Sequence, residues 1–152
     1  MSEIKSWTTH RDAKQQKLEN AASLLDGKFA KPKDAKALLE TLIDSDDKVV
    51  LEGDNQKQAS FLSKILASVD PEKVHGLHMI MSSISRTEHL DLFELGIANK
   101  MDFSFAGPQS TRVSQMIADG TMQVGDIHTY LELYARLFID LIPNVVLVGA
   151  DK

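Results

Sequence analysis

The sequence predicts an α/β domain built on a parallel sheet and preceded by an N-terminal helical extension. Short apolar runs, typical of strands covered on both faces, alternate with segments whose apolar residues recur at helical spacing. The composition is that of an ordinary globular domain, with 152 residues, 43% hydrophobic and 26% charged. A chain of this length buries about 70% of the surface that it exposes when unfolded.

Residues 1–45 are predicted to form the helical arm. Residues 7–25 are rich in Lys, Gln, Glu and Ala, and their few apolar side chains gather near the end, so we expect a mostly exposed helix. This helix either docks on a partner subunit or is a solvated arm. Asp26 and Gly27 are expected to stop it, and Pro32 to open a second helix with an apolar face over residues 38–43.

Residues 46–152 are predicted to form the α/β part. The expected strands cover residues 49–51, 77–81, 103–106 and 145–148, and the expected helices cover residues 61–69, 88–98, 110–118 and 130–142. The last strand is fully apolar, which predicts a place in the middle of the sheet. A crossover normally follows such a strand, so we expect these 152 residues to be the first, incomplete part of a larger enzyme.

The composition excludes or disfavours several classes of function. The absence of cysteine excludes a disulfide framework, a thiolate zinc site and a cysteine nucleophile, and agrees with a reducing compartment. The net charge of −5, without a basic stripe between aromatic residues, disfavours nucleic acid as a partner. No signal peptide and no run of about 20 apolar residues is present, so we expect a cytoplasmic protein that does not cross a membrane.

Three polar loops, at residues 52–56, 82–86 and 107–110, follow successive predicted strands. In a parallel sheet these loops converge at the edge where ligands bind. The first loop also opens a helix, where free backbone N–H groups and the helix dipole favour an anionic or carbonyl oxygen. Asn55, Gln56 and Gln58 add uncharged donors that can hold a thioester or amide oxygen. The alternative for this loop is a capped tight turn.

Other motifs are weaker. The chain lacks the glycine fingerprint and phosphate loop of nucleotide-binding proteins and the Gly-x-Ser-x-Gly elbow of serine hydrolases. His75 and His78 straddle a strand start without a third ligand at useful spacing, so no metal site is expected. His128 is expected to cap or pack at a helix start, with a pocket role as the alternative. Glu52 and Asp54 mark a charged turn without specifying acid/base chemistry.

Long segments of the chain resemble the alpha subunit of bacterial malonate decarboxylase, the acyl carrier protein transferase component. The resemblance begins at residues 51–59, which include Gly53, Asn55 and Gln56. It continues through residues 73–79, 88–94, 102–110 and 127–138, and is most specific over residues 49–150. Runs of this length are far more specific than any single motif above.

This resemblance implies a Rossmann-like sheet of the coenzyme A transferase type and a reaction that passes an acyl carrier protein from acetyl to malonyl, releasing acetate. The implied partners are the carrier protein and the other malonate decarboxylase subunits, with malonate and acetate as the small substrates. No cofactor or metal is implied on this chain, since the coenzyme A-derived phosphopantetheine group is carried by the partner. Family members are much longer than 152 residues, so the resemblance also indicates an amino-terminal fragment.

The resemblance assigns no catalytic residue to this chain, because the glutamate nucleophile of related coenzyme A transferases lies in the second half of the enzyme. Activity of the fragment alone is therefore not expected. The predicted substrate- or carrier-binding residues are Gly53, Asn55, Gln56, Gly107 and Gln109. The alternative function is a noncatalytic module that docks a subunit or the carrier through residues 7–25.

Overall fold

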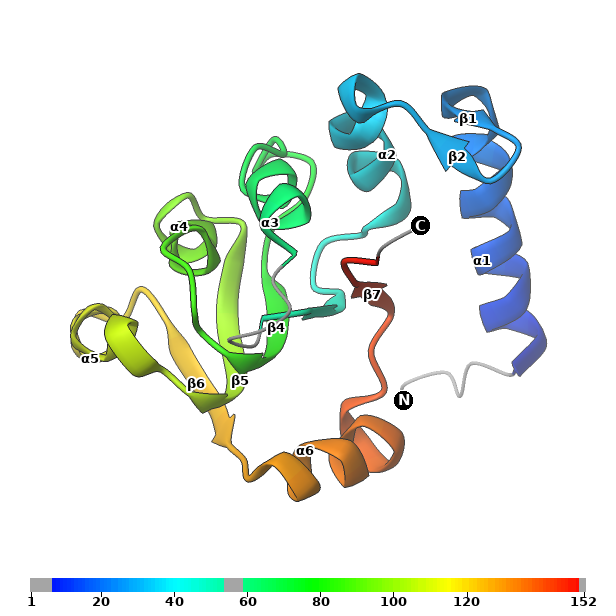
Figure 1. Cartoon of the computed structure of the whole chain (residues 1–152). Helices are drawn as coiled ribbons and strands as arrows, with labels where there is room; N and C mark the ends of the chain where they lie inside the picture. Colours follow the sequence, from blue (N-terminus) through cyan, green and yellow to red (C-terminus); the bar gives the residue numbers. More distant parts are fainter. Residues whose placement is uncertain (1–6, 54–58, 151–152) are drawn as a thin grey trace.

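A five-stranded parallel sheet forms the centre of the molecule, with strand order β6-β5-β4-β3-β7 (Figure 1). The computed structural model describes residues 7–53 and 59–150. The strands are β3 (Lys48–Leu51), β4 (Leu77–Ser83), β5 (Ala98–Phe105), β6 (Gln123–Ile127) and β7 (Val145–Leu147). The prediction of an α/β fold with a parallel sheet and an N-terminal helical extension is confirmed.

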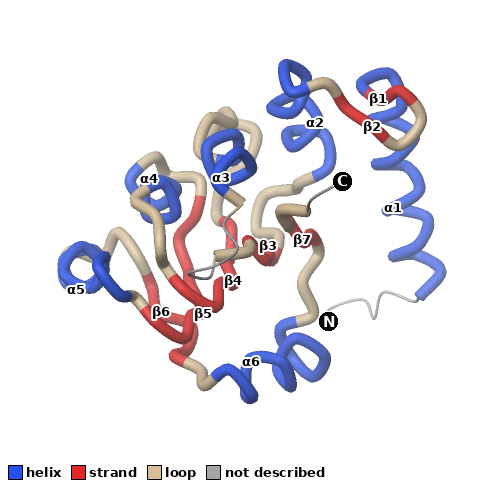
Figure 2. Tube along the Cα trace, in the orientation of Figure 1, coloured by secondary structure: helices blue, strands red, loops and turns tan. Residues whose placement is uncertain are grey.

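Two layers of helix cover the sheet. Helices α3 (Ser60–Leu66), α4 (Glu88–Glu94) and α5 (Ser110–Ala118) lie on one side, and α6 (Tyr130–Arg136) lies on the other (Figure 2). A π-helical segment, Leu137–Leu141, continues directly from α6. Among the described residues, no helix is long and apolar enough to cross a membrane.

The apolar run of β4 is explained by this double cover. Leu77, Met79 and Met81 are buried in the larger core beneath α3 to α5. Ile80 points to the other face, where it packs with Leu133 of α6 in a smaller core. Successive side chains of a strand point to opposite faces, so a strand with helices on both sides is apolar at nearly every position.

The N-terminal arm contains α1 (Trp7–Ala21), the two-residue strands β1 (Leu25–Asp26) and β2 (Phe29–Ala30), and α2 (Ala35–Leu42), with short 3-10 turns before β1 and before α2. Helix α1 ends four residues before the predicted limit. Gly27, with φ +63°, occupies the turn of the antiparallel β1–β2 hairpin instead of ending the helix. Lys17 ties α1 to the rest of the chain through Leu42 O at 3.1 Å and Asp44 at 2.7 Å. The boundary at residue 45 stays a prediction.

The strand prediction was wrong at two places, the start of β5 and the whole of β6. Helix α4 ends at Glu94 because Gly96, with φ +74°, allows the chain to close back onto the helix, where Ile97 N–H donates to Leu92 O. Strand β5 therefore begins at Ala98, five residues before the predicted start. Strand β6 was not predicted at all, because most of its residues are polar or glycine and exposed on the outer edge of the sheet.

The predicted central place of the last strand is also wrong for the part of the chain that the structure describes. Strand β7 pairs with β3 on one side and stands at the end of the sheet. Val146 is half exposed, whereas Leu147 is buried against the core. The apolar run thus predicted strand structure correctly but not the position of the strand in the sheet.

Candidate functional site

The carboxyl ends of β3 and β4 come together at the first predicted loop. A Cβ atom on Gly53 would lie 2.7 Å from Ser83 O and 2.8 Å from His89 Cε1, so only glycine fits this close approach. Ser82 Oγ lies 3.4 Å from Gly53 O. The structure therefore places Gly53 directly beside the second predicted loop. Asn55 and Gln56, like Asp54 and Gln58, lie outside the described residues, and their binding role stays a prediction.

Gly107 and Gln109 lie at the same edge of the sheet but farther along it. They form a single 3-10 turn between β5 and α5, in which Gly107 has φ +52° and Gln109 N–H donates to Ala106 O. Ile84 N–H donates to Phe105 O, which joins this loop to the one after β4. Since β4 separates β3 from β5, the strands that Gly53 and Gly107 follow lie about 10 Å apart. A role for Gly107 and Gln109 in binding stays a prediction.

A pocket of about 190 Å³ lies between the strand ends and α6. Its residues come from β3, β4 and their carboxyl ends and from α6 and the following turn. The aliphatic members are Val50, Ile80, Leu133 and Leu137, and the polar members are Glu52, Ser82, Tyr130 and Tyr134. We call this the α6 pocket. The sequence did not reveal it, because the helical period of α6 indicates packing but not which strand ends the helix covers.

A larger groove of about 520 Å³ lies between α1, the end of α2 and β7. Its lining includes Asp44, Asp47, Asn144 and Val145, which lie at the amino ends of β3 and β7. Ligands of open parallel sheets bind at the carboxyl ends of the strands. The smaller α6 pocket is therefore the better candidate site.

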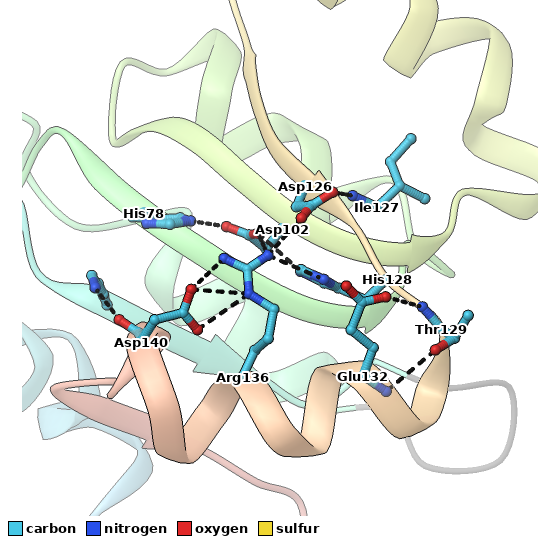
Figure 3. Close-up of polar contacts among 10 residues, drawn as sticks. His78, Asp102, Asp126, Ile127, His128, Thr129, Glu132, Arg136 and Asp140 are labelled. Atoms are coloured by element: carbon cyan, nitrogen blue, oxygen red, sulfur yellow. Dashed lines mark hydrogen bonds and ion pairs between the residues drawn. The ribbon is translucent and has the colours of Figure 1, made fainter.

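A buried carboxylate, Asp102 of β5, holds α6 against the sheet (Figure 3). Its side chain is 1% exposed, and it accepts hydrogen bonds from His78 Nε2 and from His128 Nε2, the latter at 2.9 Å. Arg136 Nη1, from the end of α6, lies 3.7 Å from Asp102 Oδ1 and 2.7 Å from Asp126 Oδ2. We call Asp102, His78, His128 and Arg136 the Asp102 network.

The charge of Asp102 is stable despite its burial. Burial raises the pKa of this carboxyl, but the hydrogen bonds and charges of His78, followed by those of His128, outweigh burial and hold the pKa below its ordinary value. Asp102 is therefore an anion at neutral pH. It positions α6, and with it one wall of the α6 pocket.

Helix α6 begins at a capping box made by Thr129 and Glu132. Thr129 Oγ1 accepts from Glu132 N–H at 3.2 Å, and Glu132 Oε2 accepts from Thr129 N–H at 3.5 Å. His128 is fully buried and bonded to Asp102, so the packing prediction for His128 is confirmed and the capping prediction is wrong. The sequence signal Thr-x-x-Glu could have identified the cap.

Three ligand-type atoms of Asp126, His128 and Glu132 lie within 4.8 Å of one another. Arg136 Nη1 lies 2.7 Å from Asp126 Oδ2 and 3.4 Å from His128 Nδ1, so a fixed cation already neutralises this corner. A metal ion would have to displace the Arg136 guanidinium, so we do not assign a metal site to these three residues. His75 and His78 are also apart in function, since His75 contacts Ser45 and Pro71 O while His78 contacts Asp102.

His89 of α4 is a polar residue that the sequence did not single out. It is fully buried next to Gly53, and neither ring nitrogen has a hydrogen-bond partner within the part of the chain that the structure describes. Burial lowers the pKa of this imidazole, so the ring is neutral. The His89 ring packs against Gly53 and thereby holds Gly53 close to the end of β4.

The comparisons with known proteins point to one family. Residues 6–152 match the family model described as malonate decarboxylase, alpha subunit, transporter. The chain belongs to the malonate decarboxylase alpha subunit family. The resemblance found in the sequence is thereby confirmed.

Relatives of this family extend well beyond the chain. An acetyl-S-ACP:malonate ACP transferase from Malonomonas rubra is 47% identical over 133 residues, which cover 86% of this chain and 24% of that protein. The malonate decarboxylase alpha subunit from Acinetobacter baumannii has 62% identity and a TM-score of 0.91, over 93% of this chain and 26% of that one. A Pseudomonas malonate decarboxylase hetero-tetramer in complex with malonate gives 59% identity and a TM-score of 0.90, over 92% of this chain and 26% of the matched one. The chain thus spans about a quarter of the length of these malonate decarboxylase relatives.

Proposed function

We propose that this chain is part of an acetyl-S-ACP:malonate ACP transferase, the alpha subunit of a cytoplasmic malonate decarboxylase. The observation that carries the proposal is the 47% identity to a relative of that name over 86% of the chain. The positions of Gly53 and the α6 pocket support it, because both lie at the carboxyl ends of the strands, where ligands of parallel sheets bind. The carrier protein, malonate, acetate and the other decarboxylase subunits are the proposed partners.

The proposed reaction exchanges one thioester for another. The C–S bond between acetyl and the carrier breaks, a C–S bond between malonyl and the same carrier sulfur forms, and acetate leaves with the oxygen that malonate gives up. No oxidant, reductant or net water is consumed. The carrier's phosphopantetheine-type arm supplies the thiol. The nucleophile that handles the acyl group is proposed to lie outside these 152 residues.

The proposed role of this chain is to provide one wall of the thioester site. Uncharged donors at strand ends stabilise a carbonyl oxygen as negative charge develops on it in the transition state. Ser82, which lines the α6 pocket, is proposed to supply such a hydroxyl. Gln56 and Gln109 are proposed to supply amides. The Asp102 network holds α6 in place and thereby sets the shape of this wall.

The test is an exchange assay with the full-length subunit, acetyl-carrier and labelled malonate. Formation of malonyl-carrier with an equal amount of acetate is expected. Gln56→Ala and Gln109→Ala are each expected to slow exchange by about tenfold or more, in the range seen for loss of a transition-state donor. Unchanged rates in both variants would remove the two glutamines from the site without affecting the proposed reaction.

A second function, docking of a partner subunit, is favoured by an exposed apolar surface. Leu131, Phe138 and Ile139, from α6 and its π-helical continuation, are 83%, 84% and 74% exposed. Large apolar patches of this kind mark interaction sites. Helix α1, the arm predicted to dock, is mostly polar at its surface.

The two docking surfaces can be compared directly in the full-length subunit. Co-purification of the other decarboxylase subunits is measured with Phe138→Asp and, separately, with residues 7–21 deleted. Loss of co-purification only with Phe138→Asp would assign docking to the α6 surface. Loss only with the deletion would assign it to the arm.

A further inference from the structure

The α6 pocket is lined mostly by uncharged side chains. Its described lining combines four aliphatic side chains with three hydroxyl groups and one charged residue, Glu52. The proposed function supplies two kinds of acyl substrate, an uncharged acetyl thioester and the dicarboxylate malonate. We infer that this pocket receives the uncharged acetyl thioester end of the carrier and rejects free carboxylates. This inference rests on the proposed function, which it makes more specific.

The charge beside the pocket disfavours a bound carboxylate. Glu52 lies at the carboxyl end of β3, and its Oε2 accepts from Gly149 N–H at 2.8 Å, which holds the carboxylate beside the pocket. Among the described residues that line the pocket, none is a Lys, Arg or His that could offset this charge. Arg136, the cation of the neighbouring network, is already bound to Asp126 and Asp140. A second carboxylate about 4 Å from Glu52 would therefore bind tens to hundreds of times more weakly than a neutral group of the same size.

The size and hydrogen bonding of the pocket suit an acetyl thioester. The pocket of about 190 Å³ equals roughly six water volumes of about 30 Å³ each, which suits an acetyl group, its sulfur and the adjoining methylenes. Val50, Ile80 and Leu133 provide apolar surface for the methyl and methylene groups. Among the described residues, the Ser82 hydroxyl donates one long hydrogen bond of 3.4 Å, to Gly53 O, which a shorter bond to a thioester carbonyl can replace.

The experiment measures binding to the full-length subunit by ligand-observed NMR and calorimetry. The probes are S-acetyl-N-acetylcysteamine, acetate and malonate. Leu137→Phe adds bulk to the pocket, and Leu95→Phe is the matched control, because Leu95 lies at the end of α4, outside the pocket, and is half exposed. We expect the thioester probe to bind at least tenfold more weakly to Leu137→Phe and unchanged to Leu95→Phe.

Glu52→Gln tests the charge argument. The variant is expected to bind the neutral probe as before and to bind acetate at least tenfold more tightly than the unaltered protein does. Tyr134→Ala, at an exposed rim position, is expected to weaken binding of the thioester probe several-fold without risk to the core. It replaces Leu137→Phe as the deciding variant if that substitution lowers the melting temperature.

Several results would overturn the inference. These are a thioester probe that fails to bind the unaltered protein, equal binding to the deciding variant, and acetate binding that Glu52→Gln leaves unchanged. The exchange assay, run in parallel on the unaltered protein, separates this inference from the proposed function. If exchange is normal and any of these results is found, the assignment of the pocket is wrong and the proposed transferase function stands. If exchange is absent and the expected binding pattern is found, the proposed transferase function is wrong and the assignment of a neutral thioester pocket stands.

Discussion

Replacing Asp102 by Asn tests how α6 is held on the sheet. Asp102 is 1% exposed, and its two oxygens serve His78, His128 and Arg136. Asparagine keeps the size of the side chain but removes its charge and turns one acceptor into a donor. Breaking a buried ionic network by removing one partner costs about 3–5 kcal/mol. We take the lower end, about 3 kcal/mol, because the remaining amide oxygen keeps one of the two histidine hydrogen bonds.

The assay is hydrogen exchange of the α6 backbone, read by mass spectrometry on the full-length subunit. A loss of about 3 kcal/mol corresponds to a local opening constant about a hundredfold larger, since each 1.4 kcal/mol is a factor of ten. Residues 130–136 are therefore expected to exchange about a hundred times faster in Asp102→Asn. The peptide containing β3 is expected to change less.

The control for this experiment is Asp26→Asn, an exposed carboxylate in the N-terminal hairpin. This variant is expected to leave exchange in α6 unchanged, within about 0.5 kcal/mol. If Asp102→Asn changed α6 exchange by less than about threefold, the network would not be what holds the helix. The positioning role of Asp102 would then be wrong.

Three further predictions concern the same wall of the site. The protection of α6 against hydrogen exchange should be constant above about pH 4 and fall on acidification. The pKa of Asp102 is lowered on folding, so its carboxylate stabilises the fold fully above the unfolded pKa of about 3.9 and loses that contribution as the pH falls through the folded pKa. Asp102→Asn should remove this fall in protection at low pH. Gly53→Ala should lower the free energy of unfolding by about 1–3 kcal/mol, since its Cβ would lie 2.7 Å from Ser83 O; an unchanged denaturation midpoint would contradict that contact. Thr129→Ala should cost about 1 kcal/mol through loss of the cap, seen as exchange about fivefold faster in the first turn of α6, whereas equal loss with Thr129→Ser would point to packing instead.

The sequence predicted the order of the helices and most of the strands, and the physical reasons are local. Runs such as residues 145–148 and the helical period of residues 130–142 depend on side chains that are neighbours in the chain. Strand β6 was missed because most of its residues are polar or glycine and exposed, and the beginning of β5 because Asn99 and Lys100 interrupt its apolar pattern. The sequence indicates only that Asp102 is a polar residue before a predicted strand. In the structure it is buried in β5 beside His78, 24 residues earlier, and His128, 26 residues later.

The candidate site was predicted in outline only. The rule that strand ends meet at one edge located Gly53 next to the loop after β4, and the structure confirms that proximity. The α6 pocket could not be foreseen, because its walls depend on the crossing of α6 over β3 and β4. The Asp102 network sets that crossing, and its members are separated by 58 residues of sequence, from His78 to Arg136.

The thioester exchange itself is the most direct test of the proposed reaction. Full-length subunit is mixed with acetyl-carrier and labelled malonate, and both products are quantified over time. Malonyl-carrier and acetate are expected in equal amounts, without added metal or nucleotide. The proposed reaction would be contradicted if no malonyl-carrier formed. This holds when the subunit is correctly folded and the other decarboxylase subunits can use the same acetyl-carrier.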